Sequence, residues 1–185
     1  MKLSVFKREG NAKSVIKKLR RQGDIPAIIY GPKVDSEKVF LKGPEFEALL
    51  RKLEAGSLGS TLFSLSLENK EHKAVVKDIH YDITSYKPIH VDFEITSEDL
   101  PVNVSVPIEL VGKEECQGVK LGGVLRPVIR FIKVRCLPKD IPAKFSLDVK
   151  NLVIGQSLKL SDIDVPENVR PLARMNEVAV AIAKR

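Results

Sequence analysis

The sequence predicts a mainly β protein with an α+β first half and an all-β second half. Short stretches of alternating apolar and polar residues recur along the chain, as expected of strands with one buried face. The two segments with helical periodicity both lie in the first third of the chain. A length of 185 residues accommodates one large domain or two of roughly 90 residues each.

The first half begins with a strand at 3–8, and residues 12–22 predict the first helix. At about 100° per residue, Val15, Ile16 and Leu19 fall on one arc of this helix and the cations on the opposite arc. We expect the apolar arc to pack on the domain core and the cations to face solvent. Gly23 follows as a C-terminal stop.

A second helix and further strands complete the first half. Pro44 predicts the first turn of this helix, and Gly56 predicts its end. Its predicted buried stripe consists of Phe46, Leu49, Leu50 and Leu53. The other predicted strands are 25–31, 38–41, 60–67, 73–82 and 88–95, with a polar hairpin turn between the third and the fourth of these.

The polar segment TSEDLP at 96–101 predicts a linker between a first domain (1–95) and a second domain (96–185). Beyond it, short strand patterns are separated by Gly, Pro and Asp turns, without a convincing amphipathic helix. The predicted strands there are VNVSVPIELVG, VIRFIKVRCLP, KFSLDV, QSLKL and EVAVAIA. The pair Gly122-Gly123 predicts a tight turn.

Cys116 and Cys136 are the only cysteines. Their spacing fits neither a CxxC metal knuckle nor a redox motif, so we expect two small thiols in a reducing compartment, although the sequence leaves a disulfide open. No segment approaches the roughly 18 apolar residues that span a bilayer. The N-terminus also lacks the pattern of a signal peptide, which predicts a protein that stays where it is made.

Basic residues are concentrated at the start of the chain. Residues 1–33 contain nine lysines and arginines and two acids, a net charge of +7 that equals the charge of the whole chain. Residues 34–185 contain 22 basic and 22 acidic side chains. Local basicity of this kind favours a polyanionic partner.

The first helix carries most of this charge and contains no acid. A generic solvated helix face mixes charges of both signs, and a membrane-surface helix carries bulky aromatic residues on its apolar arc. Neither description fits residues 12–22, whose cations repel one another without a polyanion. The cations are Lys13, Lys17, Lys18, Arg20 and Arg21. The pattern therefore favours a nucleic acid.

The strand at 88–95 adds groups of another kind, because His90 and Asp92 share one face of it. Phosphates would repel Asp92, so this carboxylate fits only if it accepts hydrogen bonds from base amino groups or orients His90. A regular A-form major groove is too narrow for side chains, which favours an RNA groove widened by non-standard pairs. Tyr30, at a strand end, can stack on a base or form a hydrogen bond.

Two other functions are open at this point. A metal-dependent enzyme would use His80, His90 and Asp92 as ligands, but two histidines and a carboxylate often occur together by chance. The chain has no Walker loop, HExxH, GxSxG or glycine-rich dinucleotide turn, so we predict neither an enzyme nor a cofactor. The other alternative is a stress-related interaction protein whose second domain binds a protein partner.

Two blocks, RxxxxKxxxxKLRRxGxIPAIIYG at 8–31 and YKPIHVDF at 86–93, resemble the bacterial large-subunit ribosomal protein twenty-five family. The second half is similar to the longer form of this family, also called general stress protein Ctc. The similar segments there are VPIELVG at 106–112, GVKLGGVL at 118–125 and LPKDIPAKFSLDVKNLVIGQSLKLSDI at 137–163. The resemblance covers essentially the whole chain.

This resemblance implies a cytoplasmic ribosomal protein that binds 5S ribosomal RNA at loop E, a widened groove of non-Watson-Crick pairs in the central protuberance. It implies neighbouring large-subunit proteins as partners and no membrane, cofactor or small-molecule substrate. It further implies a small β-barrel with helices for 1–95 and an all-β module for 96–185. The RNA-binding residues carried over are Arg8, Lys13, Lys17, Arg20, Tyr30, His90 and Asp92, with Lys18 and Arg21 as phosphate neighbours.

The chain departs from the family pattern at three places. Ala12-Lys13-Ser14 replaces a common Gly-Lys-Gly, so this backbone can be helical rather than an open loop. Lys17-Lys18 replaces a common arginine pair, which keeps the charge but loses the bidentate fork and shifts specific recognition to Arg20. His80 stands where relatives often carry glutamine.

Overall fold

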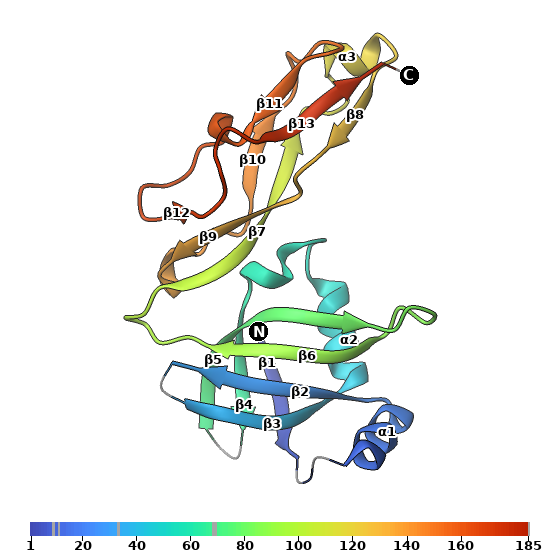
Figure 1. The fold of residues 1–185 in the computed structure, drawn as a ribbon, viewed down its shortest axis with the longest axis vertical. Coiled ribbons are helices and arrows are strands. Elements are labelled where there is room, and N and C mark those ends of the chain that lie inside the picture. The colour runs from blue at the N-terminus through green and yellow to red at the C-terminus, as the bar shows by residue number, and fades with distance from the viewer. Residues whose placement is uncertain (9, 11, 33, 68–69, 185) are drawn as a thin grey trace. The chain divides into compact units, whose positions relative to one another are not determined.

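The computed structural model describes residues 1–8, 10, 12–32, 34–67 and 70–184. The chain divides into two compact units, Met1–Leu100 and Pro101–Arg185, each with its own sheets (Figure 1). The fold is mostly β, as the sequence predicts.

Six strands of the first unit close into a barrel in the order β1-β3-β2-β6-β5-β4. Strands β1 and β4 pair in parallel, as do β2 and β6, and the other neighbours are antiparallel. Closure removes the free strand edges that an open sheet would expose. The strands are β1 (Lys2–Lys7), β2 (Asp24–Gly31), β3 (Val34–Lys42), β4 (Leu62–Leu67), β5 (Lys70–Tyr81) and β6 (Pro88–Ile95).

The barrel core follows from the alternation in its strands. In β6, Val91, Phe93 and Ile95 point inward, and His90 and Asp92 point outward. The edge-to-face contact of Phe63 and Phe93, with ring centroids 6.5 Å apart, adds to this packing. The alternation therefore commits one face of β6 to the core and leaves the other for polar contacts.

Helix α2 (Gly43–Lys52) completes this core, with Pro44 in its first turn as predicted. Phe46 is fully buried, and the three leucines of the predicted stripe pack against the core as half-buried side chains. The predicted end of the helix at Gly56 is wrong, because the cap residue is already Leu53. Gly56 instead has φ 87° and precedes the 3-10 turn η1 (Ser57–Ser60).

The second unit contains a four-stranded sheet, β10-β7-β9-β12, and a three-stranded sheet, β11-β13-β8. Short β8 and β12 and the one-turn helix α3 (Gln117–Lys120) were not predicted. The strands are β7 (Val102–Val111), β8 (Val124–Pro127), β9 (Phe131–Cys136), β10 (Phe145–Asp148), β11 (Ser157–Lys159), β12 (Arg170–Pro171) and β13 (Val178–Ala183). The 3-10 turns are η2 (Pro138–Asp140) and η3 (Leu160–Asp162).

The two cysteines both lie in the core of the second unit and are free. Cys116 precedes α3 and donates its thiol to the Leu152 carbonyl at 3.5 Å, and Cys136 ends β9. Burial raises the pKa of the Cys136 thiol, and the nearby Asp140 carboxylate acts in the same direction. Both thiols serve as small packed side chains.

Candidate nucleic-acid interface

Helix α1 (Lys13–Gln22) lies outside the barrel, beside β2 (Figure 1). It begins at Lys13, so the departure from Gly-Lys-Gly does give a helical backbone at this residue. Gly23 ends it in the left-handed region, with φ 84°, and donates its N–H to the Arg20 carbonyl. The basic pair Arg20 and Arg21 lies in the last turn, where the helix dipole favours cations.

The predicted packing of the apolar arc of α1 on the core is wrong. None of the ten described residues of α1 is fully buried. The apolar arc is only half-buried at Val15, Ile16 and Leu19, and these three side chains are not part of the barrel core. The helix therefore covers the outside of a barrel whose interior is already filled by the strands and α2. All five of its cations are exposed.

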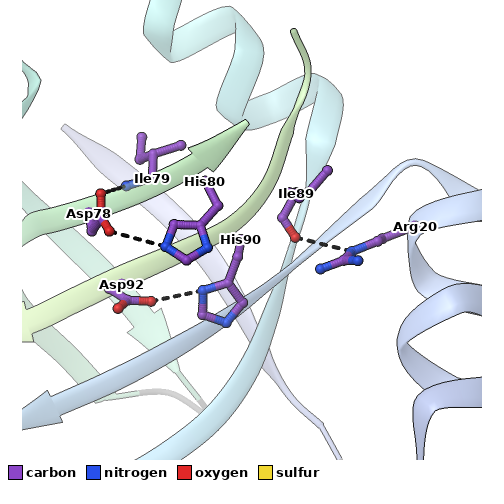
Figure 2. A network of polar contacts seen from close by, with 7 residues as sticks. All are labelled: Arg20, Asp78, Ile79, His80, Ile89, His90 and Asp92. Atoms are coloured by element: carbon purple, nitrogen blue, oxygen red, sulfur yellow. Dashed lines mark hydrogen bonds and ion pairs between the residues drawn. The ribbon is translucent and has the colours of Figure 1, made fainter. Parts of the chain in front are cut away.

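Two hydrogen bonds to backbone carbonyls fix the position of α1. The N–H of Gly43 donates to the Gly23 carbonyl at 3.2 Å, which joins the end of α1 to the start of α2. A Cβ at Gly43 would lie 2.1 Å from that oxygen, so this approach requires glycine. Arg20 Nε donates to the Ile89 carbonyl of β6 at 3.2 Å (Figure 2). Arg20 thus holds the helix against the strand that carries His90.

His90 and Asp92 form a close pair on the outer face of β6, as Figure 2 shows. His90 Nδ1 lies 2.8 Å from Asp92 Oδ1, and both side chains are largely shielded from solvent. The contact has the distance of an ion pair without the alignment of a hydrogen bond, so Oδ1 retains capacity to accept. The pair presents a carboxylate beside an imidazole in a half-buried setting.

The charge of His90 follows from this setting. Burial lowers the pKa of His90, and His80 and Arg20 act in the same direction, against Asp92, which raises it. The imidazole is accordingly neutral at neutral pH. When the neutral ring carries its proton on Nδ1, the nitrogen that faces Asp92, Nε2 is available to accept a hydrogen bond.

A second pair lies directly beside the first on β5, and the sequence predicted only its His80, as a candidate metal ligand. Asp78 is the register partner of Asp92, and His80 is that of His90. His80 Nε2 lies 3.1 Å from Asp78 Oδ2, and the two imidazole rings are 5.9 Å apart. The i,i+2 spacing of Asp78 and His80 could have indicated this pair from the sequence, because it places both residues on one strand face.

In the described part of the chain, no His, Cys, Asp and Glu cluster is placed to hold a metal.

Tyr30 lies on β2, whose parallel pairing with β6 places it opposite Glu94. Burial raises the pKa of the Tyr30 phenol, and the carboxylates of Glu94, Asp92 and Asp78 raise it further. The phenol therefore stays protonated and can donate a hydrogen bond. Tyr30 and the two His–Asp pairs thus share the outer face of β2, β6 and β5.

Arg8 follows β1 and is half-buried. Its backbone N–H donates to the Lys38 carbonyl at 2.9 Å. The guanidinium atoms Nε and Nη1 are buried and have no hydrogen-bond partner among the described residues. An unpaired buried cationic donor is costly, so a ligand oxygen at this position would be favourable.

The structure therefore brings some of the predicted RNA-binding residues together and leaves the others apart. Arg20 is tied to β6, and Tyr30, His90 and Asp92 lie on paired strands. No hydrogen bond or ion pair among the described residues links Lys13, Lys17, Lys18, Arg21 or Arg8 to that cluster.

Each helix of the described chain falls short of the length and apolar character needed to cross a membrane.

Comparison with known proteins decides the family. Residues 3–93 match the model of the ribosomal L25p family, and residues 101–185 match that of the C-terminal domain of ribosomal protein TL5. The large ribosomal subunit protein bL25 of Chlamydia muridarum is 48% identical over all 185 residues of both chains. The chain belongs to the ribosomal L25p family. Similar relatives of the same name in Chlamydia abortus and Chlamydia pneumoniae are 46% and 44% identical over the full length.

Membership in the L25p family confirms the predicted resemblance. The chain is a structural constituent of the large subunit of the cytoplasmic ribosome. The family consists of ribosomal structural proteins and not enzymes, so the metal-enzyme hypothesis on His80, His90 and Asp92 is set aside.

Proposed function

We propose that this large-subunit protein binds 5S ribosomal RNA at loop E, in the central protuberance, next to other large-subunit proteins. We assign RNA binding to a first domain of residues 1–95 and treat 96–185 as a second domain, joined at 96–101. The observation that carries the proposal is the Arg20–Ile89 hydrogen bond, which fixes an acid-free cationic helix beside a strand face with polar acceptors.

In this proposal the exposed side of α1 supplies attraction to phosphates. Lys13, Lys17 and Arg20, with Arg8, neutralise phosphates and set the register, while Lys18 and Arg21 lie near other phosphates. The unpaired donors of Arg8 support this role, because phosphate oxygens would satisfy them. If about five phosphates are neutralised, log K falls with log salt at a slope near −4.

The strand face supplies selection among RNA shapes. Asp92 retains an unused acceptor, and a neutral His90 offers Nε2, so both can accept hydrogen bonds from base amino groups. Tyr30 provides a protonated phenol as donor. These short, half-buried groups require a groove wide enough to admit a protein strand, which a regular A-form major groove is not.

The test is a titration of the full chain against a 5S RNA hairpin containing loop E, with a regular duplex of equal length as competitor. We expect a strong preference for loop E, reduced in Arg20→Ala. The control is Arg174→Ala, an exposed arginine of the second unit. Equal binding to both RNAs, with salt sensitivity alone, would reduce α1 to a general polyanion-binding stripe and refute loop E recognition.

A further inference from the structure

The turn between β5 and β6, residues 82–87, exposes large apolar side chains beside the candidate RNA interface. Ile83 is 91% exposed and Tyr86 is 80% exposed, and Tyr81 at the base of the turn is 48% exposed. Single exposed apolar residues are common on protein surfaces, whereas a contiguous group marks an interaction site. We define these three side chains as the hairpin knob.

The knob is held by an ordered turn. The N–H of Asp82 donates to the Lys87 carbonyl at 2.8 Å, and the N–H of Tyr86 donates to the Asp82 carbonyl at 2.9 Å. The Asp82 carboxylate accepts the N–H groups of Thr84 and Ser85, and these bonds lower the pKa of the Asp82 carboxyl. The backbone that carries the exposed side chains is therefore held in one conformation, which reduces the entropy lost on binding.

A groove of about 270 Å³ lies between the knob and helix α2. Its apolar lining includes Tyr81, Tyr86 and Pro88 from the hairpin and Leu50 from α2. Glu47 and Arg51, an ion pair at 3.8 Å, and the cation Lys87 also line it. The surface thus combines an apolar centre with charges of both signs.

This composition differs from that of α1 and determines the kind of partner. An RNA-binding surface is dominated by cations, whereas the three knob side chains carry no formal charge and apolar side chains make up most of the groove lining. Ile83 offers no hydrogen bond to a base or a sugar. Protein interfaces, in contrast, have aromatic and aliphatic centres with polar groups at the rim.

We propose that the hairpin knob is the docking site for another protein of the large subunit, one that offers an apolar pocket to Ile83 and a side chain to the groove. The inference rests on the proposed RNA contact for its location: His80 and Ile89 flank the hairpin, and Ile89 binds Arg20. The partner is therefore a protein that lies against the same RNA.

The test compares Ile83→Ser, Tyr86→Gly and the double variant with Leu121→Ser, a matched exposed aliphatic residue of the second unit. Glycine at 86 suits the φ of 54° and preserves the turn while removing the ring. We expect affinity for isolated 5S ribosomal RNA to stay within twofold. Retention of the double variant on salt-washed large subunits that lack this protein should fall at least tenfold, and Leu121→Ser should change neither.

A photoreactive benzophenone amino acid in place of Ile83 identifies the partner class on assembled subunits. A cross-link to a ribosomal protein supports the docking site, whereas a cross-link to RNA overturns it. Unchanged retention of both single variants and the double variant also overturns it. If the wild-type chain shows no preference for loop E while retention still depends on Ile83, the RNA proposal fails and the docking proposal stands.

Discussion

Helix α1 carries five exposed cations and no acid, whereas the outer face of β5 and β6 carries two His–Asp pairs in register, of which His90–Asp92 is largely shielded and His80–Asp78 is exposed. In the proposed function the helix acts through charge, which attracts any polyanion over a Debye length of about 8 Å at physiological salt. In the same proposal the strand face acts through hydrogen bonds that form only when a partner fits. The comparison separates affinity, expected from α1, from selectivity, expected from β2, β6 and β5.

The largest expected effect comes from removing the charge of α1. Replacing Lys17, Lys18, Arg20 and Arg21 together by glutamine should lower affinity for loop E RNA at least about a hundredfold and reduce the salt slope from near −4 to about −1.5, the value for the remaining Lys13 and Arg8. Glutamine keeps the helix, because its helix propensity is similar to that of lysine and arginine. Titrations at four salt concentrations measure the slope, with circular dichroism as the folding control. An unchanged slope would show that α1 does not neutralise phosphates.

The second effect concerns selectivity alone. Asp92→Asn removes the acceptor charge and adds a donor that opposes base amino groups, so preference for loop E over duplex should fall about tenfold or more. Affinity for the duplex should stay the same or rise, since an anion has been removed from the surface. Competition between the two RNAs measures the ratio, and Asp164→Asn in the second unit is the control. Equal losses for both RNAs would contradict the division between affinity and selectivity.

Arg20 belongs to both regions and allows a sharper comparison. Arg20→Lys keeps the charge but loses the Nε bond to the Ile89 carbonyl, which is worth about 1 kcal/mol or a fivefold change. We expect an unchanged salt slope and a loop E preference reduced about fivefold. Arg21→Lys, one residue along the same helix, should leave both quantities unchanged. A reduced slope in Arg20→Lys would mean that the arginine acts on phosphates alone.

The smallest effect is on stability as a function of pH. Burial lowers the pKa of His90 below its ordinary value of 6.5, so the unfolded chain binds more protons than the folded one as pH falls toward and below 6.5. The stabilisation that His90 contributes is therefore fully present above pH 6.5. It decreases as the pH falls below 6.5, until the pH has passed the pKa of His90 in the folded state. Urea midpoints at pH 7 and pH 5 should differ less in His90→Gln than in the wild type, by roughly 0.2 M. His72→Gln serves as the control, and identical pH dependence in all three proteins would refute this assignment.

The sequence predicted much of the fold because local rules govern it. The helix at 12–22, the strands of the first half and the Gly122-Gly123 turn all depend on periodicity and backbone propensity over a few residues. The errors occur where packing decides. Gly56 does not end α2, and Val15, Ile16 and Leu19 do not enter the core, because the barrel strands and Phe46 already fill it.

The sequence by itself determined the charge of α1, the inward and outward faces of β6, and the family. Only the tertiary structure decided which distant groups meet. The Arg20–Ile89 bond joins residues 69 positions apart, and the pairing of β5 with β6 brings Asp78 beside Asp92. Periodicity reports which face of an element is polar, but strand order and register decide which polar faces become neighbours, and these depend on closing the barrel as a whole.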